Sequence, residues 1–335
     1  MGIIRYLLAI TVVIAHMPFG EELSFLPSKV AVRSFFIISG YYTAMIIKKY
    51  PTAKSFLVSR FLRLYPAYLL FFLIGFITLP NGGFHFIKKI CDLPFLAFML
   101  TLIANFTMFF NDVILFLAGV TTPRIDNLII LPPIWSVSLE LHFFTLAPLL
   151  LRFRTVTLFV LMALSIVLCA TLRSAFSFQG PLWDNRFFPF EISYFLLGCI
   201  SYRLFGLLKM GYYVKSGHIF LFAIIVVILN FRAIPLEDDL KQLVFSLLLA
   251  VSMPAIFFVT RDLKIDNHIG MLSYPIYLSH IIVIQLVGAF SKSQSVNLFV
   301  VILLTSGLSC FVVEFIDKPA NRFRAKLANV SVGAK

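Results

Sequence analysis

The chain has 335 residues, of which 60% are hydrophobic and 13% charged, and its mean hydropathy is +0.98. No water-soluble core of this size needs so many apolar residues, so the composition excludes a soluble globular protein and indicates an all-α, polytopic membrane protein. The net charge of +13 is scattered over short loops instead of gathering on one face, which argues against a nucleic-acid partner.

Ten apolar runs have the length that a helix needs to cross a bilayer, roughly 17–25 residues. They are 3–19, 31–49, 62–79, 135–151, 155–172, 187–207, 217–233, 241–259, 270–289 and 296–316. A further apolar segment, 93–120, would invert all later runs if it crossed once, so the basic loops favour zero or two crossings. We expect a re-entrant segment that turns near Asn111 and Asp112. The basic residues then gather on one side, which predicts that both termini are cytoplasmic.

The first run, "RYLLAITVVIAH", begins with Arg5 and ends with His16. Eleven residues make about three turns of helix, so both side chains lie on one face and can line one conduit. An imidazole can accept a proton from an attacking hydroxyl, which makes His16 a candidate general base. The alternative is that Arg5 snorkels to the cytoplasmic interface and His16 is an interfacial polar cap.

The second and third runs carry polar residues in "FFIISGYY" and "SRFLRLYP". Ser39 and Gly40 lie mid-span, where small residues let helices approach closely and where Ser39 is a possible nucleophile. Arg60 and Arg63 are spaced i, i+3, so on a helix they form a guanidinium pair suited to phosphate, with Tyr65 just inside the membrane. The alternative is that these arginines only fix the topology and touch anionic headgroups.

The fourth run begins with "PPIWSVSLELHFF", which contains Trp135, Ser138, Glu140 and His142. Neither Glu140 nor His142 has a Lys or Arg within a helical turn, so each needs a partner from elsewhere. Glu140 is expected to face the same interior as His16, as an orienting partner or proton carrier. A purely structural hydrogen bond is the alternative.

The stretch "LSYPIYLSHIIV" places Ser273 and His280 seven residues apart, hence on one helix face, with Tyr277 between them. They are candidate supporting residues of the same interior, or polar contacts between helices. The four cysteines are scattered without metal or redox spacing and are interpreted as packing residues.

Taken in order, "RYLLAITVVIAH", "VRSFFIISGYY", "RFLRLYP", "IWSVSLELHFF", "LSYPIYLSH" and "VEFIDKP" resemble the acyltransferase family 3 integral membrane proteins, which O-acylate extracytoplasmic glycans. The resemblance implies a cytoplasmic acyl-CoA donor, usually acetyl-CoA, and no permanently bound cofactor or metal. It also implies that His16 is an essential catalytic residue and that Arg60 and Arg63 are essential, with the donor phosphates as their ligand. The acceptor would be a surface polysaccharide such as lipopolysaccharide O-antigen, or a lipid-linked oligosaccharide.

Two departures from the family pattern affect the carboxylates. Members often have two adjacent acids after the Trp-Ser motif, whereas this chain has Glu140 followed by Leu141. The closing motif usually has Glu before a basic residue and Pro, and here Asp317 occupies that position, with Glu314 as a second candidate.

The combined prediction is an acyltransferase 3 transmembrane domain at 1–317 and a short basic cytoplasmic tail at 318–335, without a fused esterase-like domain. The expected location is a bacterial inner membrane, where membrane lipids surround the protein. Of the candidate residues, His16, Arg5 and Glu140 are predicted to be catalytic, and Arg60, Arg63 and Tyr65 to bind the donor. A transporter or flippase for a lipid-linked glycan or acyl donor is the main alternative, and a non-catalytic scaffold is a second.

Overall fold

The computed structural model describes residues 1–18, 20–80, 82–114, 128–176, 186–205, 216–290 and 297–329, and these are helical without any strand. The first half contains α1 (Gly2–Ala15), α2 (Gly20–Leu23), α3 (Ser28–Ile46), the 3-10 turn η1 (Ile47–Lys49), α4 (Ala53–Thr78), α5 (Gly83–Cys91), α6 (Phe95–Thr107) and α8 (Ile134–Leu150). The second half contains α9 (Thr155–Phe176), α11 (Phe188–Phe205), α13 (Gly217–Asn230), η3 (Phe231–Ala233), α14 (Asp238–Thr260), α15 (Lys264–Phe290), α16 (Leu298–Val312), the π-helical segment η4 (Val313–Asp317) and α17 (Lys318–Asn329). The all-α prediction is confirmed.

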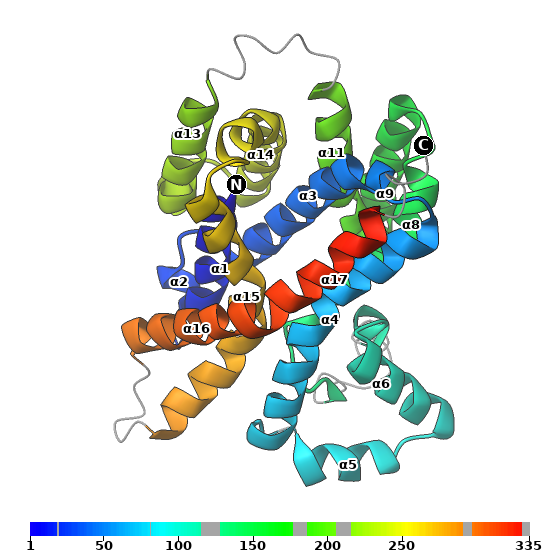
Figure 1. Cartoon of the computed structure of the whole chain (residues 1–335), viewed down its shortest axis with the longest axis vertical. Coiled ribbons are helices and arrows are strands. Elements are labelled where there is room, and N and C mark those ends of the chain that lie inside the picture. Colours follow the sequence, from blue (N-terminus) through cyan, green and yellow to red (C-terminus); the bar gives the residue numbers. More distant parts are fainter. Residues whose placement is uncertain are drawn as a thin grey trace.

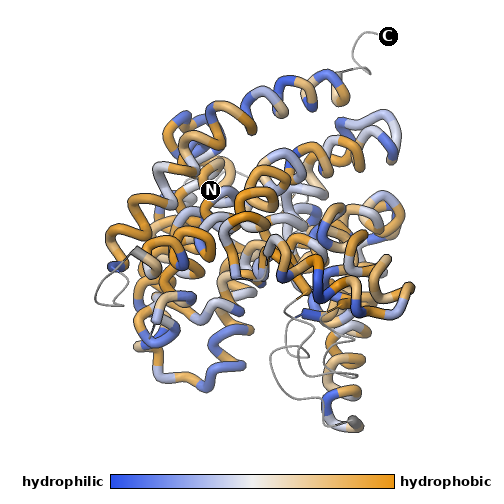
Figure 2. The backbone as a smooth tube through the Cα atoms, turned by 90° about the horizontal axis from the view of Figure 1, so that it is seen from below, coloured by the Kyte–Doolittle hydropathy of each residue, from blue (hydrophilic) through white to orange (hydrophobic). Residues whose placement is uncertain are grey.

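Within the described ranges, six helices are long and apolar enough to cross a membrane, which agrees with the interpretation of the composition. They are Ser28–Lys49, Ala53–Thr78, Thr155–Ala175, Asp238–Thr260, Lys264–Ala289 and Leu298–Ala328. Four shorter apolar helices accompany them: Gly2–Ala15, Phe95–Thr107, Ile134–Leu150 and Gly217–Ala233. Every one of the ten predicted runs contains a helix, but α1, α8, α11 and α13 are not among the six, so the number of ten crossings stays a prediction. Figure 2 shows that hydrophobic residues follow most helices, whereas hydrophilic residues cluster at helix ends and along the helix that leads to the C-terminus.

The predicted re-entrant segment is described only as far as residue 114. Its helix α6 has 13 residues, or about 20 Å of rise, which is too short to cross about 30 Å of hydrocarbon. The chain turns after α6 through Met108 and Phe110, which both have left-handed backbone conformations (φ 65° and 66°). Asn111 and Asp112, where the turn was predicted, follow at once and are buried. Residues 115–120 lie outside the described part.

Of the predicted tail, residues 318–329 form α17, which continues from α16 through η4. This helix packs against α4, and Figure 1 shows the two lying alongside each other across the middle of the molecule.

The centre of the bundle is built on close packing of α3 against α11 and of α1 against α15. Gly40 explains how α3 approaches α11, because a Cβ at this position would lie 2.0 Å from the Phe195 carbonyl oxygen. Gly198 of α11 meets α3 in the same way, with its Cβ position 2.0 Å from the Ile37 oxygen. Gly40 therefore supports the site by allowing two backbones to touch.

Replacing Gly40 with alanine should lower the unfolding free energy by about 1–3 kcal/mol or more, because the clash is with backbone, which cannot rotate away. Thermal unfolding of the detergent-purified protein measures the effect. Gly307→Ala in α16 is the matched control, since a Cβ there meets no atom within 4 Å. Equal unfolding temperatures for the two variants would contradict the packing argument.

Candidate active site

A partly open cavity lies where α1, α3, α4, α8 and α15 meet, and its empty space, open solvent included, is about 670 Å³. Its apolar wall consists of Val32, Phe35, Phe36, Ile38, Leu64 and Val137. Its polar residues are Arg5, Ser39, Tyr42, Arg63, Ser136, Glu140, Ser273, Tyr274 and Tyr277. Five elements from both halves of the chain thus bring their polar side chains to one cavity.

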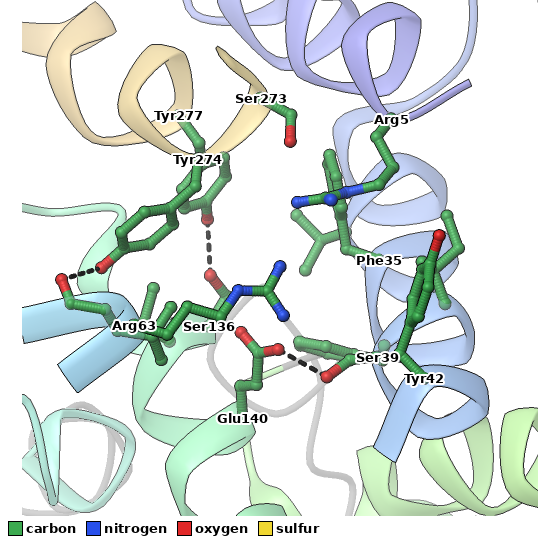
Figure 3. Close-up of a pocket in the computed structure, with 15 residues that line it drawn as sticks. Arg5, Phe35, Ser39, Tyr42, Arg63, Ser136, Glu140, Ser273, Tyr274 and Tyr277 are labelled. Atoms are coloured by element: carbon green, nitrogen blue, oxygen red, sulfur yellow. Dashed lines mark hydrogen bonds between the residues drawn. The ribbon is translucent and has the colours of Figure 1, made fainter. Parts of the chain in front are cut away.

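The charged centre of the cavity consists of two guanidinium groups and one carboxylate. Figure 3 shows Arg5 and Arg63 extending into the same space, with the Arg63 guanidinium beside the Glu140 carboxylate. Ser39 Oγ donates a hydrogen bond of 2.5 Å to Glu140 Oε1, which orients that carboxylate. Inside low-dielectric surroundings, two cations with one anion favour binding of a further negative group or polarisation of a carbonyl oxygen.

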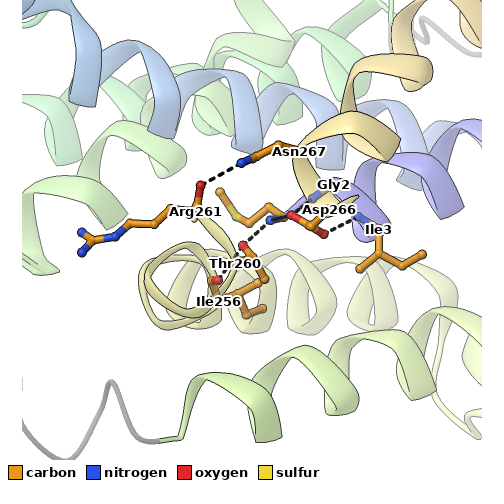
Figure 4. A network of polar contacts seen from close by, with 8 residues as sticks. Gly2, Ile3, Ile256, Thr260, Arg261, Asp266 and Asn267 are labelled. Carbon is orange, nitrogen blue, oxygen red and sulfur yellow. Dashed lines mark hydrogen bonds and ion pairs between the residues drawn. The ribbon is translucent and has the colours of Figure 1, made fainter. Parts of the chain in front are cut away.

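The start of α1, which carries Arg5, is fixed by Asp266 at the start of α15. Asp266 accepts hydrogen bonds from the Gly2 and Ile3 backbone N–H groups at 2.7 and 2.9 Å, and from the Met1 amino group at 2.6 Å (Figure 4). A carboxylate at a helix N-terminus satisfies orphan N–H donors and complements the helix dipole. This contact sets the position of α1 along α15, and hence the height of Arg5 in the cavity.

Tyrosines form another wall of the cavity. The Tyr277 hydroxyl lies 2.7 Å from Ser136 Oγ and donates to the Pro133 carbonyl at 3.1 Å, and the Tyr274 hydroxyl donates to the Leu64 carbonyl at 3.0 Å. Tyr42 also lines the cavity. Sequence reasoning found Tyr277 but missed Tyr42 and Tyr274, although the tyrosines of "SGYY" and "LSYPIY" were in the quoted motifs.

His16 is absent from the cavity lining and connects to it through other rings. Its ring lies 4.9 Å, between centroids, from the ring of His280, which lies 5.8 Å from the ring of Tyr277. His16 Nδ1 is 2.8 Å from the Val12 carbonyl and His280 Nδ1 is 2.7 Å from the Tyr277 carbonyl. A carbonyl only accepts, so each neutral imidazole has its proton on Nδ1 and a lone pair on Nε2. His280 is fully buried, and its Nε2 has no hydrogen-bond partner among the described residues.

Arg60 and Arg63 have different surroundings, although both belong to α4. Arg63 lines the cavity, whereas Arg60 is 4% exposed, donates to the Tyr50 hydroxyl at 3.2 Å and lies over the Phe56 and Phe144 rings. The predicted pair is thus divided between the cavity and an aromatic pocket behind it. Tyr65 stacks on Phe61, with 4.6 Å between ring centroids, and does not line the cavity.

The other face of α8 has a separate polar cluster around Asp112. Ser138 Oγ donates to Asp112 Oδ1 at 2.8 Å, and His142 Nδ1 lies 3.4 Å from Asp112 Oδ2. The partner that His142 needs therefore comes from the segment after α6. Trp135 is buried, and the Arg186 guanidinium lies 5.4 Å above its ring. None of these three α8 residues lines the cavity.

The two candidate carboxylates of the closing motif differ in position. Glu314 is half exposed and pairs with Lys318 one turn later. Asp317 is partly buried, and the charges that act on it come from Arg63 and Arg324. Asp317 is thus nearer to the charged centre than Glu314.

An ion pair that sequence reasoning missed joins α3 to α11. Arg33 Nη2 donates to Glu191 Oε1 at 2.5 Å, the Arg33 Nε lies 3.0 and 3.1 Å from the two carboxylate oxygens, and the Glu191 side chain is fully buried. Both residues stand in apolar runs, which was the signal available in the sequence.

The variant Arg33→Ala should lower the unfolding free energy by about 3–5 kcal/mol, because it leaves a buried carboxylate without its cation. The double variant Arg33→Met, Glu191→Leu removes both charges and should recover most of that loss. Thermal unfolding compares the three proteins. A double variant as unstable as the single one would contradict this account.

No group of three or more His, Cys, Asp or Glu side chains that could hold a metal ion occurs in the described ranges.

Comparison with known proteins identifies a family. The family model described as an acyltransferase domain matches residues 1–315 of the chain. No curated protein and no solved structure matches the chain. The matched residues include all five helices that form the cavity.

Proposed function

The chain belongs to the acyltransferase family whose model covers residues 1–315, and we propose that this membrane acyltransferase is an O-acetyltransferase of surface glycans. The donor would be cytoplasmic acetyl-CoA. The acceptor would be a hydroxyl of an extracytoplasmic polysaccharide, such as lipopolysaccharide O-antigen, or of a lipid-linked oligosaccharide. The membrane would be a bacterial inner membrane, with both termini cytoplasmic.

The observation that carries the proposal is a row of side chains, here called the route, that links the charged cavity to the histidine pair. Arg63, Arg5 and Glu140 line the cavity, Tyr277 lines it further along, and the rings of His280 and His16 follow in contact. Arg5 and His16 are separated by about 16 Å of rise along α1. The route thus offers a cationic end for a polyanionic donor and an imidazole end for a hydroxyl acceptor.

The charge of the CoA phosphates determines where the donor would bind. The phosphates of CoA cannot cross hydrocarbon, so only the acyl group and the thin pantetheine arm need to enter the protein. Arg60 and Arg63 would bind the phosphates, and the apolar wall beside Phe35, Phe36 and Leu64 would suit the pantetheine arm.

We favour direct transfer over an acyl-enzyme. Because Val12 holds the proton of His16 on Nδ1, the His16 Nε2 lone pair is the base that takes the acceptor's hydroxyl proton. The acceptor oxygen attacks the thioester carbonyl carbon, a C–O bond forms as the C–S bond breaks, and the imidazolium returns the proton to the CoA thiolate. At the other end of the route, Arg5 and Arg63 would neutralise the negative charge of the donor, and Glu140 would hold both guanidiniums in place.

The test uses a host that lacks the gene, complemented with the wild type, with empty vector or with the Arg60→Gln, Arg63→Gln double variant. Membrane levels are matched by blot, and the isolated surface polysaccharide is analysed by mass spectrometry and proton NMR. We expect an acetyl mass increment and a shifted sugar proton with the wild type alone.

Two outcomes would overturn the proposal. A polysaccharide that reaches the surface without an acyl group in the presence of the wild type would exclude this acceptor. A polysaccharide that fails to reach the surface without the gene would favour a transporter.

A further inference from the structure

The arginines at and behind the cavity form a cluster that contains Arg60, Arg63 and a third member, Arg324. Arg324 comes from α17, a helix that the proposed function does not use. Arg324 of α17 is half buried, and its Nε donates to the Ser59 carbonyl at 2.8 Å and lies 3.4 Å from Ser59 Oγ. A second contact, from Arg324 Nη1 to Asn321 Oδ1, orients the guanidinium from within α17. Arg324 is thus anchored on α4, one residue before Arg60.

Arg60 and Arg324 meet at the same pair of hydroxyl groups. The Tyr50 hydroxyl lies 2.7 Å from Ser59 Oγ and accepts a hydrogen bond from Arg60 Nη2. Arg60 is 4% exposed, and within the described part of the chain its Nε has no hydrogen-bond acceptor. A buried guanidinium with an unused donor is costly unless an acceptor binds there.

The charges of this cluster are unbalanced. Arg60 and Arg63 each act electrostatically on Arg324, and Arg63 also acts on Arg60. Among the described residues, the carboxylates that interact with these arginines include Glu140, which acts on Arg60, and Asp317, on which Arg63 and Arg324 act. Three cations with two carboxylates leave a net positive charge in a partly buried place, which favours an anionic ligand.

The pKa of Tyr50 is affected by the same positive charges. Burial of its ring raises the pKa of Tyr50, but the hydrogen bond with Ser59 and the guanidiniums of Arg60 and Arg324 together lower it below its ordinary value. The surroundings therefore stabilise negative charge at this point.

We propose that Arg324 completes a three-arginine phosphate site with Arg60 and Arg63, and that this site binds the phosphates of the CoA donor. The inference rests on the proposed function. CoA carries a pyrophosphate and a 3′-phosphate, so its charge exceeds what two guanidiniums can neutralise. Arg324 comes from α17, so the site is assembled only when α17 is packed against α4.

The test measures the Kd of CoA for the full chain in detergent, by calorimetry, for the wild type and three variants. Arg324→Gln should weaken CoA binding about tenfold, because it removes a charge-assisted contact. Lys326→Gln is the charge-matched control on the exposed side of α17 and should bind within twofold of the wild type. Arg324→Lys keeps the charge but loses the planar fork, and should weaken binding about threefold.

A second readout separates phosphate binding from a loss of structure. With S-acetylpantetheine, a donor without the 3′-phosphate and the pyrophosphate, Arg324→Gln should have the kcat/KM of the wild type, whereas with acetyl-CoA its kcat/KM should fall about tenfold. A structural defect would lower both values alike and would overturn the inference. If Arg324→Gln cannot be isolated folded, the Arg324→Lys comparison decides, and equal CoA binding there overturns it.

The remaining outcomes are distinguishable. Equal CoA binding by the wild type and Arg324→Gln overturns this inference alone. If Arg324→Gln loses phosphatidylglycerol binding from mixed micelles but keeps its CoA affinity, the ligand is a lipid headgroup and the inference is overturned. A wild type that does not bind CoA overturns the proposed function together with it.

Discussion

His16→Gln should lower the rate of acetyl transfer by about a hundredfold or more while leaving the Kd of CoA unchanged. Glutamine keeps a polar group near His280 but cannot take up a proton, and general-base catalysis contributes roughly 10²–10⁴-fold. The affinity should persist because His16 lies about 16 Å along α1 from Arg5, at the opposite end of the route from Arg60 and Arg63. The measurement combines calorimetric CoA binding with acetylation of polysaccharide isolated from the host that lacks the gene.

The matched control is His85→Gln in α5, where the histidine is exposed and makes no contact with the cavity. It should keep wild-type values of both quantities. A His16→Gln protein with more than a tenth of the wild-type rate would remove His16 as the base. It would also revive the transporter interpretation, because a transport pathway tolerates a neutral polar residue at this position.

Hydropathy predicted the helices well because a bilayer demands long apolar runs and leaves little choice of secondary structure. Each predicted run contains a helix. The re-entrant course of 93–120 stays a prediction, because α1 and α13, with 14 residues each, are almost as short as α6 with 13. The packing partners were not predictable in the same way. The contact of α3 with α11 depends on Gly40 meeting the backbone at Phe195, and a single sequence does not show which of its small residues face each other.

The site was predicted where the signal is local and missed where it depends on tertiary contacts. A polar group inside a membrane needs a polar partner, so the predicted polar residues gather in one cavity. They are Arg5, Ser39, Arg63, Glu140 and Tyr277. Helical spacing suggested that Arg60 would join them. Three residues along a helix leave Arg60 about 60° around the axis from Arg63, and there it meets the rings of Tyr50, Phe56 and Phe144 instead. Periodicity alone gave no information about those rings.

The contacts of Arg324 were also not predictable from the sequence, because they depend on tertiary packing. In the sequence, Arg324 belongs to the segment 318–335, which was predicted to be a short basic cytoplasmic tail. Only the packing of α17 on α4 brings it to Ser59, 265 residues earlier, and so beside Arg60. Likewise, Asp112 became the partner of His142 only through the turn after α6.

Glu140→Gln should lower kcat about tenfold to a hundredfold and leave CoA binding as tight as in the wild type or tighter. The amide is nearly isosteric and can still accept the hydrogen bond from Ser39 Oγ, so the change removes charge with little change of shape. Without the carboxylate, Arg5 and Arg63 lose the anion beside them (Figure 3), and their repulsion should move Arg5, so that the bound donor no longer places its thioester correctly against His16. The extra net positive charge favours the phosphates of the donor.

The Glu140 prediction is specific because kcat should fall while CoA binding stays as tight or becomes tighter. A residue that only holds the fold would, when changed, weaken binding and turnover together, and a residue that binds donor would raise Kd. Glu314→Gln, which removes the exposed carboxylate paired with Lys318, is the charge-matched control and should change neither quantity. Ser39→Ala should lower kcat as Glu140→Gln does, but less. In the Ser39→Ala, Glu140→Gln double variant the two losses of kcat should be less than additive, because the two side chains act through one hydrogen bond. Fully additive effects would mean that Ser39 acts independently of Glu140, as it would if it formed an acyl-enzyme.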